Sequence, residues 1–175
     1  MSYLRFGAMI LTSTVVMYGL MYLNTYELDH ALFSQTRVWM AIVMGATMAF
    51  IMLAFMLEMH KNRAANLAIL AGSVVVFGLS LWLVRSQATV DDVSYMEAMV
   101  PHHSIAIMTS RRANISDPRV RELADEIAQT QVEEIAQMKR LIADLKANPQ
   151  PANAPELPAG SSQSELEPAA QPPNT

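Results

Sequence analysis

The sequence of 175 residues predicts an all-α protein in three parts: a membrane domain over residues 1–86, a helical hairpin over 87–147 and a disordered tail over 148–175. Three observations predict this organisation. Long uncharged segments fill the first part, helix-start signals mark the second, and proline and alanine dominate the third. The charge is also divided, because residues 1–86 carry five basic and three acidic groups whereas residues 87–175 carry seven and thirteen.

Three uncharged segments predict the membrane domain. No Asp, Glu, Lys or Arg occurs in residues 6–26, 38–57 or 64–84. An α-helix rises about 1.5 Å per residue, so about 20 residues cross the hydrocarbon core of a bilayer. None of the segments has the amphipathic stripe of a soluble helix, and the first is too long for a signal peptide. We therefore expect three transmembrane helices, with the lipid bilayer as a partner.

The short loops predict the orientation of these helices. Residues 58–63 carry a net positive charge, which favours the cytoplasmic side, and Arg5 agrees. The loop over residues 24–37 contains acidic groups and suits the outer side. Trp39 and Trp82 then fall at the outer interface, where aromatic residues are enriched. We expect a cytoplasmic N-terminus and an extracytoplasmic hairpin.

Capping signals predict the two helices of the hairpin. The first covers about residues 91–112, with acidic residues in its first turn and arginines in its last, which complement the helix dipole. Asp117 and Pro118 are typical of the N-cap and first position of a second helix, which reaches about Lys146. Residues 148–175 hold seven of the nine prolines and have no apolar periodicity, so we expect them to be disordered.

An apolar stripe on the second helix predicts its buried face. It runs through Val120, Ala124, Ile127, Gln131, Glu134, Met138, Leu141 and Leu145. At about 100° per residue, Glu134 lies about 20° from Ile127 and about 40° from Met138, in the middle of the stripe. A carboxylate in an apolar seam is costly unless a cation compensates it, so we expect a cation beside Glu134.

The first helix offers side chains for such a site. Met99 and His103 share one face, and His102 lies about 60° beyond Met99. Antiparallel packing would present these three side chains to Glu134 and Met138. Imidazole binds copper, zinc, nickel and iron, whereas thioether selects Cu(I), and the chain has no cysteine to supply a thiolate. Copper, as Cu(I) or Cu(II), is therefore the favoured metal ion.

Two other roles stay open, and two classes are disfavoured. The methionines can fill a core and a Glu–His ion pair can fix register, in a metal-free hairpin that dimerises or docks on a partner. A three-span Cu(I) channel is less favoured, because five methionines spaced every four residues over 40–56 wind through about 160°. A pI near 5.5 argues against nucleic acid as a partner. No nucleophile–base arrangement or phosphate loop indicates an enzyme.

The hairpin resembles a known family. Met99-Val-Pro-His102-His103, followed by Met108, resembles the M-x-x-H-H signature of the bacterial domain-of-unknown-function family three hundred and five. The second helix resembles the family in Gln131-x-x-Glu134-Ile-x-x-Met138, and the likeness covers about residues 90–146.

The resemblance implies a ferritin-like helical fold and a role in copper binding and resistance. From the spans and their loops, we expect the protein in the bacterial inner membrane with a periplasmic hairpin. The implied ligands are Met99, His102, His103, Met108, Gln131, Glu134 and Met138. One hairpin supplies only half of a four-helix bundle, so a homodimer is expected. The expected function is that of a membrane-anchored extracytoplasmic copper-binding protein in copper buffering, handling or resistance.

Overall fold

The structure, a computed structural model, describes residues 2–151, 154–155 and 157. Its elements are α1 (Tyr3–Leu20), η1 (Leu28–His30), α2 (Gln35–Phe55), η2 (Leu57–Met59), α3 (Arg63–Ser86), α4 (Asp92–Arg112) and α5 (Pro118–Ala147). All are helical, and this part of the chain contains no strand. The all-α prediction is confirmed; most of the predicted disordered tail, residues 158–175, lies outside the described residues.

Helices α1, α2 and α3 are each long and apolar enough to cross a membrane. Helices α2 and α3 match the predicted spans to within three residues at either end. Helix α1 ends at Leu20, six residues before the predicted end of the first span. The Arg37 guanidinium donates a hydrogen bond of 2.7 Å to the carbonyl of Met21, and the hydroxyl of Tyr22 accepts one from the backbone of Ser34. These contacts satisfy the end of α1 and turn the chain away from the helix axis.

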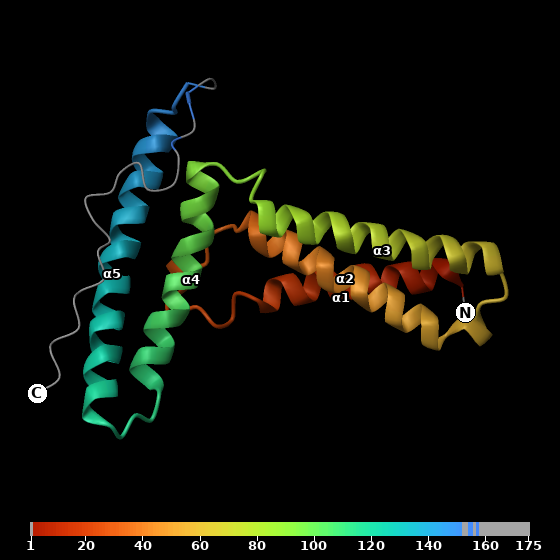
Figure 1. Ribbon diagram of the computed structural model, residues 1–175, viewed down its shortest axis with the longest axis horizontal. Helices are drawn as coiled ribbons and strands as arrows, with labels where there is room; N and C mark the ends of the chain where they lie inside the picture. The colour runs from red at the N-terminus through yellow and green to blue at the C-terminus, as the bar shows by residue number, and fades with distance from the viewer. Residues whose placement is uncertain (1, 152–153, 156, 158–175) are drawn as a thin grey trace, which may run out of the picture.

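Helix α2 lies between the other two and packs against both (Figure 1). Its Gly45 permits the close approach of α1, because a Cβ atom at this position would collide with the Thr14 side chain. The three helices therefore form a bundle, in which the chain reverses direction at η1 between α1 and α2 and at η2 between α2 and α3.

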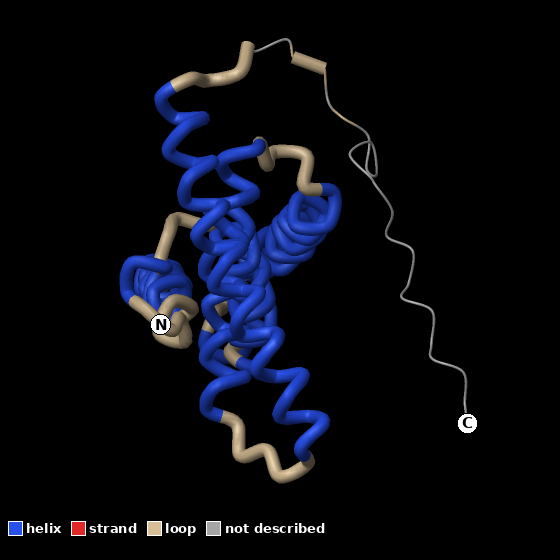
Figure 2. The backbone as a smooth tube through the Cα atoms, turned by 90° about the vertical axis from the view of Figure 1, so that its left-hand side faces the viewer, coloured by secondary structure: helices blue, strands red, loops and turns tan. Residues whose placement is uncertain are grey.

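Helices α4 and α5 form an antiparallel hairpin that lies crosswise at one end of this bundle (Figure 1). Helix α4 is next to the bundle and α5 is on its far side; Figure 2 shows the hairpin from that side, running across the bundle behind it. The hairpin core contains Met96, Val100 and Ile107 of α4 with Ile135 and Ile142 of α5. Both predicted helix starts are confirmed, since the Asp91 and Asp117 side chains cap α4 and α5.

The buried stripe of α5 differs from the predicted one by one residue. Ala128, Ile135 and Ile142 are buried, whereas Ile127 and Leu141 are 39% and 43% exposed. Two seven-residue apolar repeats lie side by side on this helix, and α4 covers the one with Ala128. The prediction that Glu134 occupies the middle of the apolar seam is therefore wrong, because Glu134 lies on its flank.

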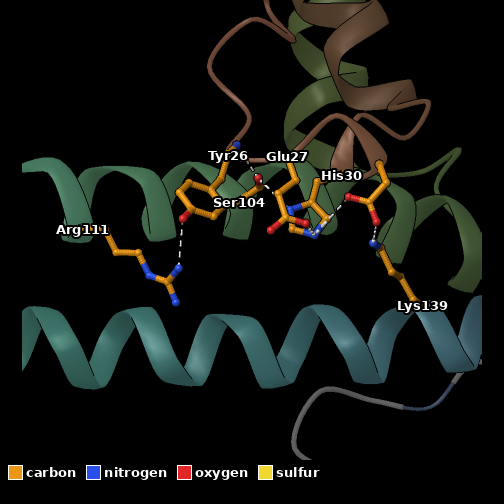
Figure 3. Close-up of polar contacts among 7 residues, drawn as sticks. Tyr26, Glu27, His30, Ser104, Arg111 and Lys139 are labelled. Carbon is orange, nitrogen blue, oxygen red and sulfur yellow. Dashed lines mark hydrogen bonds and ion pairs between the residues drawn. The ribbon is translucent and has the colours of Figure 1, made fainter.

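The α1–α2 loop docks on the hairpin (Figure 3). The backbone N–H of Tyr26 donates a hydrogen bond of 2.7 Å to the hydroxyl oxygen of Ser104, a fully buried residue of α4. The Arg111 guanidinium donates one of 3.0 Å to the Tyr26 hydroxyl. Lys139 of α5 forms an ion pair of 2.7 Å with Asp29. The loop thereby fastens both hairpin helices to the membrane domain.

Candidate metal site

A groove of about 1110 Å³ runs between α4 and α5 and extends to the end of α3. Four of the seven predicted ligand residues line it: Met99, His103, Glu134 and Met138. Ser86 and Gln87, where α3 ends, line it as well. Of the predicted ligands, two thioethers, one imidazole and one carboxylate therefore line a common space beside the end of α3. Asp91, Asp92 and Met96 line it as well.

His103 and Glu134 form a polar contact across this groove, between α4 and α5. The Nδ1 atom of His103 lies 2.9 Å from Oε2 of Glu134, and their side chains are 16% and 43% exposed. Nδ1 is buried, and the contact lacks the geometry of a hydrogen bond. The contact therefore places two potential ligand atoms, one from each helix of the hairpin, side by side in the groove.

Gln131 acts on the carboxylate from its own helix. Its side-chain amide donates a hydrogen bond of 3.0 Å to Oε2 of Glu134. Gln131 does not line the groove. Its contact orients Glu134 toward His103, as partners outside the ligand shell do at metal sites.

Burial sets the protonation state of His103. It lowers the pKa of the imidazole below its ordinary value; Glu134 opposes this shift, and His102 adds to it. The neutral form, which can coordinate a metal ion, is thereby favoured near neutral pH. The lowered pKa of His103 therefore favours the protonation state in which its imidazole can act as a ligand.

The structure does not bring His102 and Met108 into the groove. His102 is exposed, and its ring centroid lies 6.0 Å from that of His103 in an edge-on arrangement. Met108 is half-buried further along α4. The angular positions of these residues around the axis of α4 explain this result. His102 lies about 100° from His103 around the helix, and Met108 lies about 140° from it.

The donor set of the groove fits copper. Thioether sulfur is a soft ligand that selects Cu(I), and imidazole binds both oxidation states of copper. The structure describes no thiolate, because the chain has no cysteine.

A second group of ligand-type side chains lies in the α1–α2 loop. The ligand atoms of Glu27, Asp29 and His30 are all within 4.8 Å of one another. From the sequence alone, the charges of this loop predict only the orientation of the membrane domain. The sequence signal was the short Glu-x-Asp-His spacing between two spans, whose meaning depends on the burial of His30 by α4.

The chain is similar to an uncharacterized protein of Acanthamoeba polyphaga mimivirus. The two are 27% identical over 147 residues, and the match covers 80% of this chain and 95% of the viral protein. No solved structure matches the chain. Residues 92–173 match the family described as "Domain of unknown function (DUF305)", so the resemblance of the hairpin to this family is confirmed.

Proposed function

We propose that this protein is a membrane-anchored copper-binding protein whose hairpin acts outside the cytoplasm in copper buffering, handling or resistance. The observation that carries the proposal is that Met99, His103, Glu134 and Met138, from two helices, line one groove. The methionine sulfurs and the His103 imidazole would hold the ion, and Glu134 would offset its charge.

The distribution of charge along the bundle supports an extracytoplasmic hairpin. The basic loop around η2 lies at the end of the bundle that is remote from the hairpin (Figure 1). Short basic loops stay in the cytoplasm, so the hairpin belongs on the opposite side. This orientation puts the groove, which includes Ser86 at the end of α3, close to the outer membrane–water boundary.

Copper binding by the purified full chain in detergent tests the proposal. His103→Ala is the informative variant, and His102→Ala is its matched control, because the two residues are neighbours and only His103 lines the groove. We expect His103→Ala to weaken Cu(I) binding at least about tenfold in a chelator competition, with His102→Ala close to the wild type. Equal affinities for His103→Ala and the wild type would remove the site.

A metal-free assembly role is the second candidate, and the exposed face of α5 favours it. Val120, Leu123, Ile127 and Leu141 are 50%, 55%, 39% and 43% exposed. A second copy of the hairpin would cover this stripe and complete a four-helix bundle. Under this role Glu134→Leu should strengthen the dimer in analytical ultracentrifugation, whereas under the copper role it should abolish metal binding.

A further inference from the structure

The loop between α1 and α2 holds a cluster of three potential ligands against the hairpin. Glu27 precedes η1, and Asp29 and His30 lie within it. Their ligand atoms are within 4.8 Å of one another, and His30 is only 7% exposed. A buried imidazole thus faces two carboxylates at the boundary between the membrane domain and the hairpin (Figure 3).

The two ring nitrogens of His30 have different surroundings. Nδ1 lies 3.0 Å from the Ser104 hydroxyl oxygen, which is in hydrogen-bond distance. Nε2 lies 3.8 Å from Oε2 of Glu27 and 3.7 Å from Oδ1 of Asp29, which is beyond it. Among the described residues, Nε2 therefore points at the carboxylates without a hydrogen-bond partner.

These spacings suit an ion between the three groups. Two ligand atoms that are each about 2.1 Å from a metal ion lie about 3.4 Å apart at a tetrahedral angle. The Nε2 to oxygen distances of 3.7 and 3.8 Å are close to this value.

Hydrogen bonds from neighbouring residues orient the ligand side chains, as they commonly do at metal sites. A metal-binding histidine commonly donates its second N–H to an oxygen, and Ser104 is placed to accept it from Nδ1. Ligating carboxylates are in turn hydrogen-bonded, and Lys139 binds Oδ2 of Asp29 at 2.7 Å, so that Oδ1 is left facing His30. These two contacts fix which atoms are directed at the centre.

The cluster opens into a cavity of its own. This space of about 310 Å³ is lined by the three ligand residues and by Arg111 and Lys139, among others. Both cations are engaged, Arg111 by the Tyr26 hydroxyl and Lys139 by Asp29. The cavity has room for water molecules that would complete the coordination of an ion.

We propose that Glu27, Asp29 and His30 bind a divalent transition-metal ion of the zinc class, with Ser104 and Lys139 as positioning residues. The donors are two oxygens and one nitrogen, a set that suits Zn²⁺, Mn²⁺ or Fe²⁺ and lacks the sulfur that selects Cu(I). The ligands belong to the loop, and the positioning residues belong to α4 and α5. An ion here therefore strengthens the attachment of the hairpin to the membrane domain.

Zinc titration of the full chain in detergent tests this site, with Zn²⁺ alone as the probe. Glu27→Gln is the informative variant because the Glu27 side chain is 56% exposed, so we expect the substitution to leave the packing of the hairpin unchanged. We expect one zinc site in the wild type, at least about tenfold weaker binding in Glu27→Gln and in His30→Ala, and unchanged binding in Glu126→Gln, an exposed carboxylate of α5.

The groove provides the control that separates the two sites. His103→Ala should bind zinc as the wild type does, and Glu27→Gln should keep the Cu(I) affinity of the wild type. The proposal is overturned if the wild type takes up no zinc, if Glu27→Gln binds it like the wild type, or if His103→Ala abolishes the zinc site.

Discussion

The Nδ1 atom of His103 lies 2.9 Å from Oε2 of Glu134, and this contact joins α4 to α5 at the groove. The carboxylate oxygen also accepts a hydrogen bond from Gln131, so it is held from its own helix while it faces the imidazole. Neither residue is in the hydrophobic core. Both residues line the groove, so the pair lies beside its open space.

Glu134→Gln tests the carboxylate. The amide keeps the size of the side chain but removes its negative charge, so we expect Cu(I) affinity to fall about tenfold or more. Chelator competition measures this change. Glu133→Gln is the control, because Glu133 is an exposed neighbour that accepts a hydrogen bond from Gln129. If both variants lose the same affinity, the effect comes from the overall charge of α5 and not from the site.

The lowered pKa of His103 predicts a pH dependence of stability. In the unfolded chain the imidazole takes up a proton near its ordinary pKa of 6.5, whereas in the folded protein it does so only at lower pH. Its contribution to stability is thus fully present above about pH 6.5 and is lost as the pH falls through the folded pKa.

Unfolding of the metal-free protein between about pH 5 and pH 8 measures this effect. The difference in stability between the wild type and His103→Gln should change in favour of the variant as the pH falls, because Gln cannot be protonated. Copper binding should weaken over the same interval, since protons compete for the ligand. A difference that is constant over the whole range contradicts the prediction.

Ser104→Ala tests the docking of the α1–α2 loop. Ser104 is fully buried, and its hydroxyl oxygen accepts the backbone N–H of Tyr26. Its removal leaves that donor without its partner, which costs about 1–3 kcal/mol. We expect a lower unfolding temperature in detergent. Thr109→Ala, which removes an exposed hydroxyl that donates to carbonyls of its own helix, should have a smaller effect.

Cysteine labelling tests the orientation of the membrane domain. The natural chain has no cysteine, so a single introduced thiol is the sole target. In intact cells a membrane-impermeant maleimide should label Ala88→Cys, which follows α3, and should label Lys61→Cys, which precedes it, only after lysis. The reverse pattern would place the hairpin in the cytoplasm and refute the proposed extracytoplasmic role.

Local signals predicted most of the helices. Asp91 and Asp117 are followed by residues whose backbone N–H groups they cap, and this information is contained within one turn. Span length is likewise a local property. The early end of α1 was not predictable in this way, because it depends on Arg37, which lies after the turn and donates to the carbonyl of Met21.

Contacts between distant segments account for the rest. The sequence predicts that Met99, His102 and His103 lie opposite Glu134 and Met138, and the structure brings all of them except His102 to one groove. The predicted seam on α5 lies one residue away from the observed one. Helix α5 carries two adjacent apolar repeats, and the sequence of α5 alone does not indicate which of them α4 covers. The burial of His30 depends on Ser104, which lies far from it in the sequence, and no spacing within the loop indicates it.

The crosswise hairpin has a consequence for encounters with other molecules. With α1–α3 in a bilayer, the contacts of the α1–α2 loop with Ser104 and Lys139 restrict the motion of the hairpin relative to the membrane domain. The groove then stays at a nearly constant height and diffuses laterally with its anchor. Under the proposed copper role, transfer of the ion to another integral protein would be a two-dimensional search, in which the shared membrane raises the effective concentration of each partner without any additional contact.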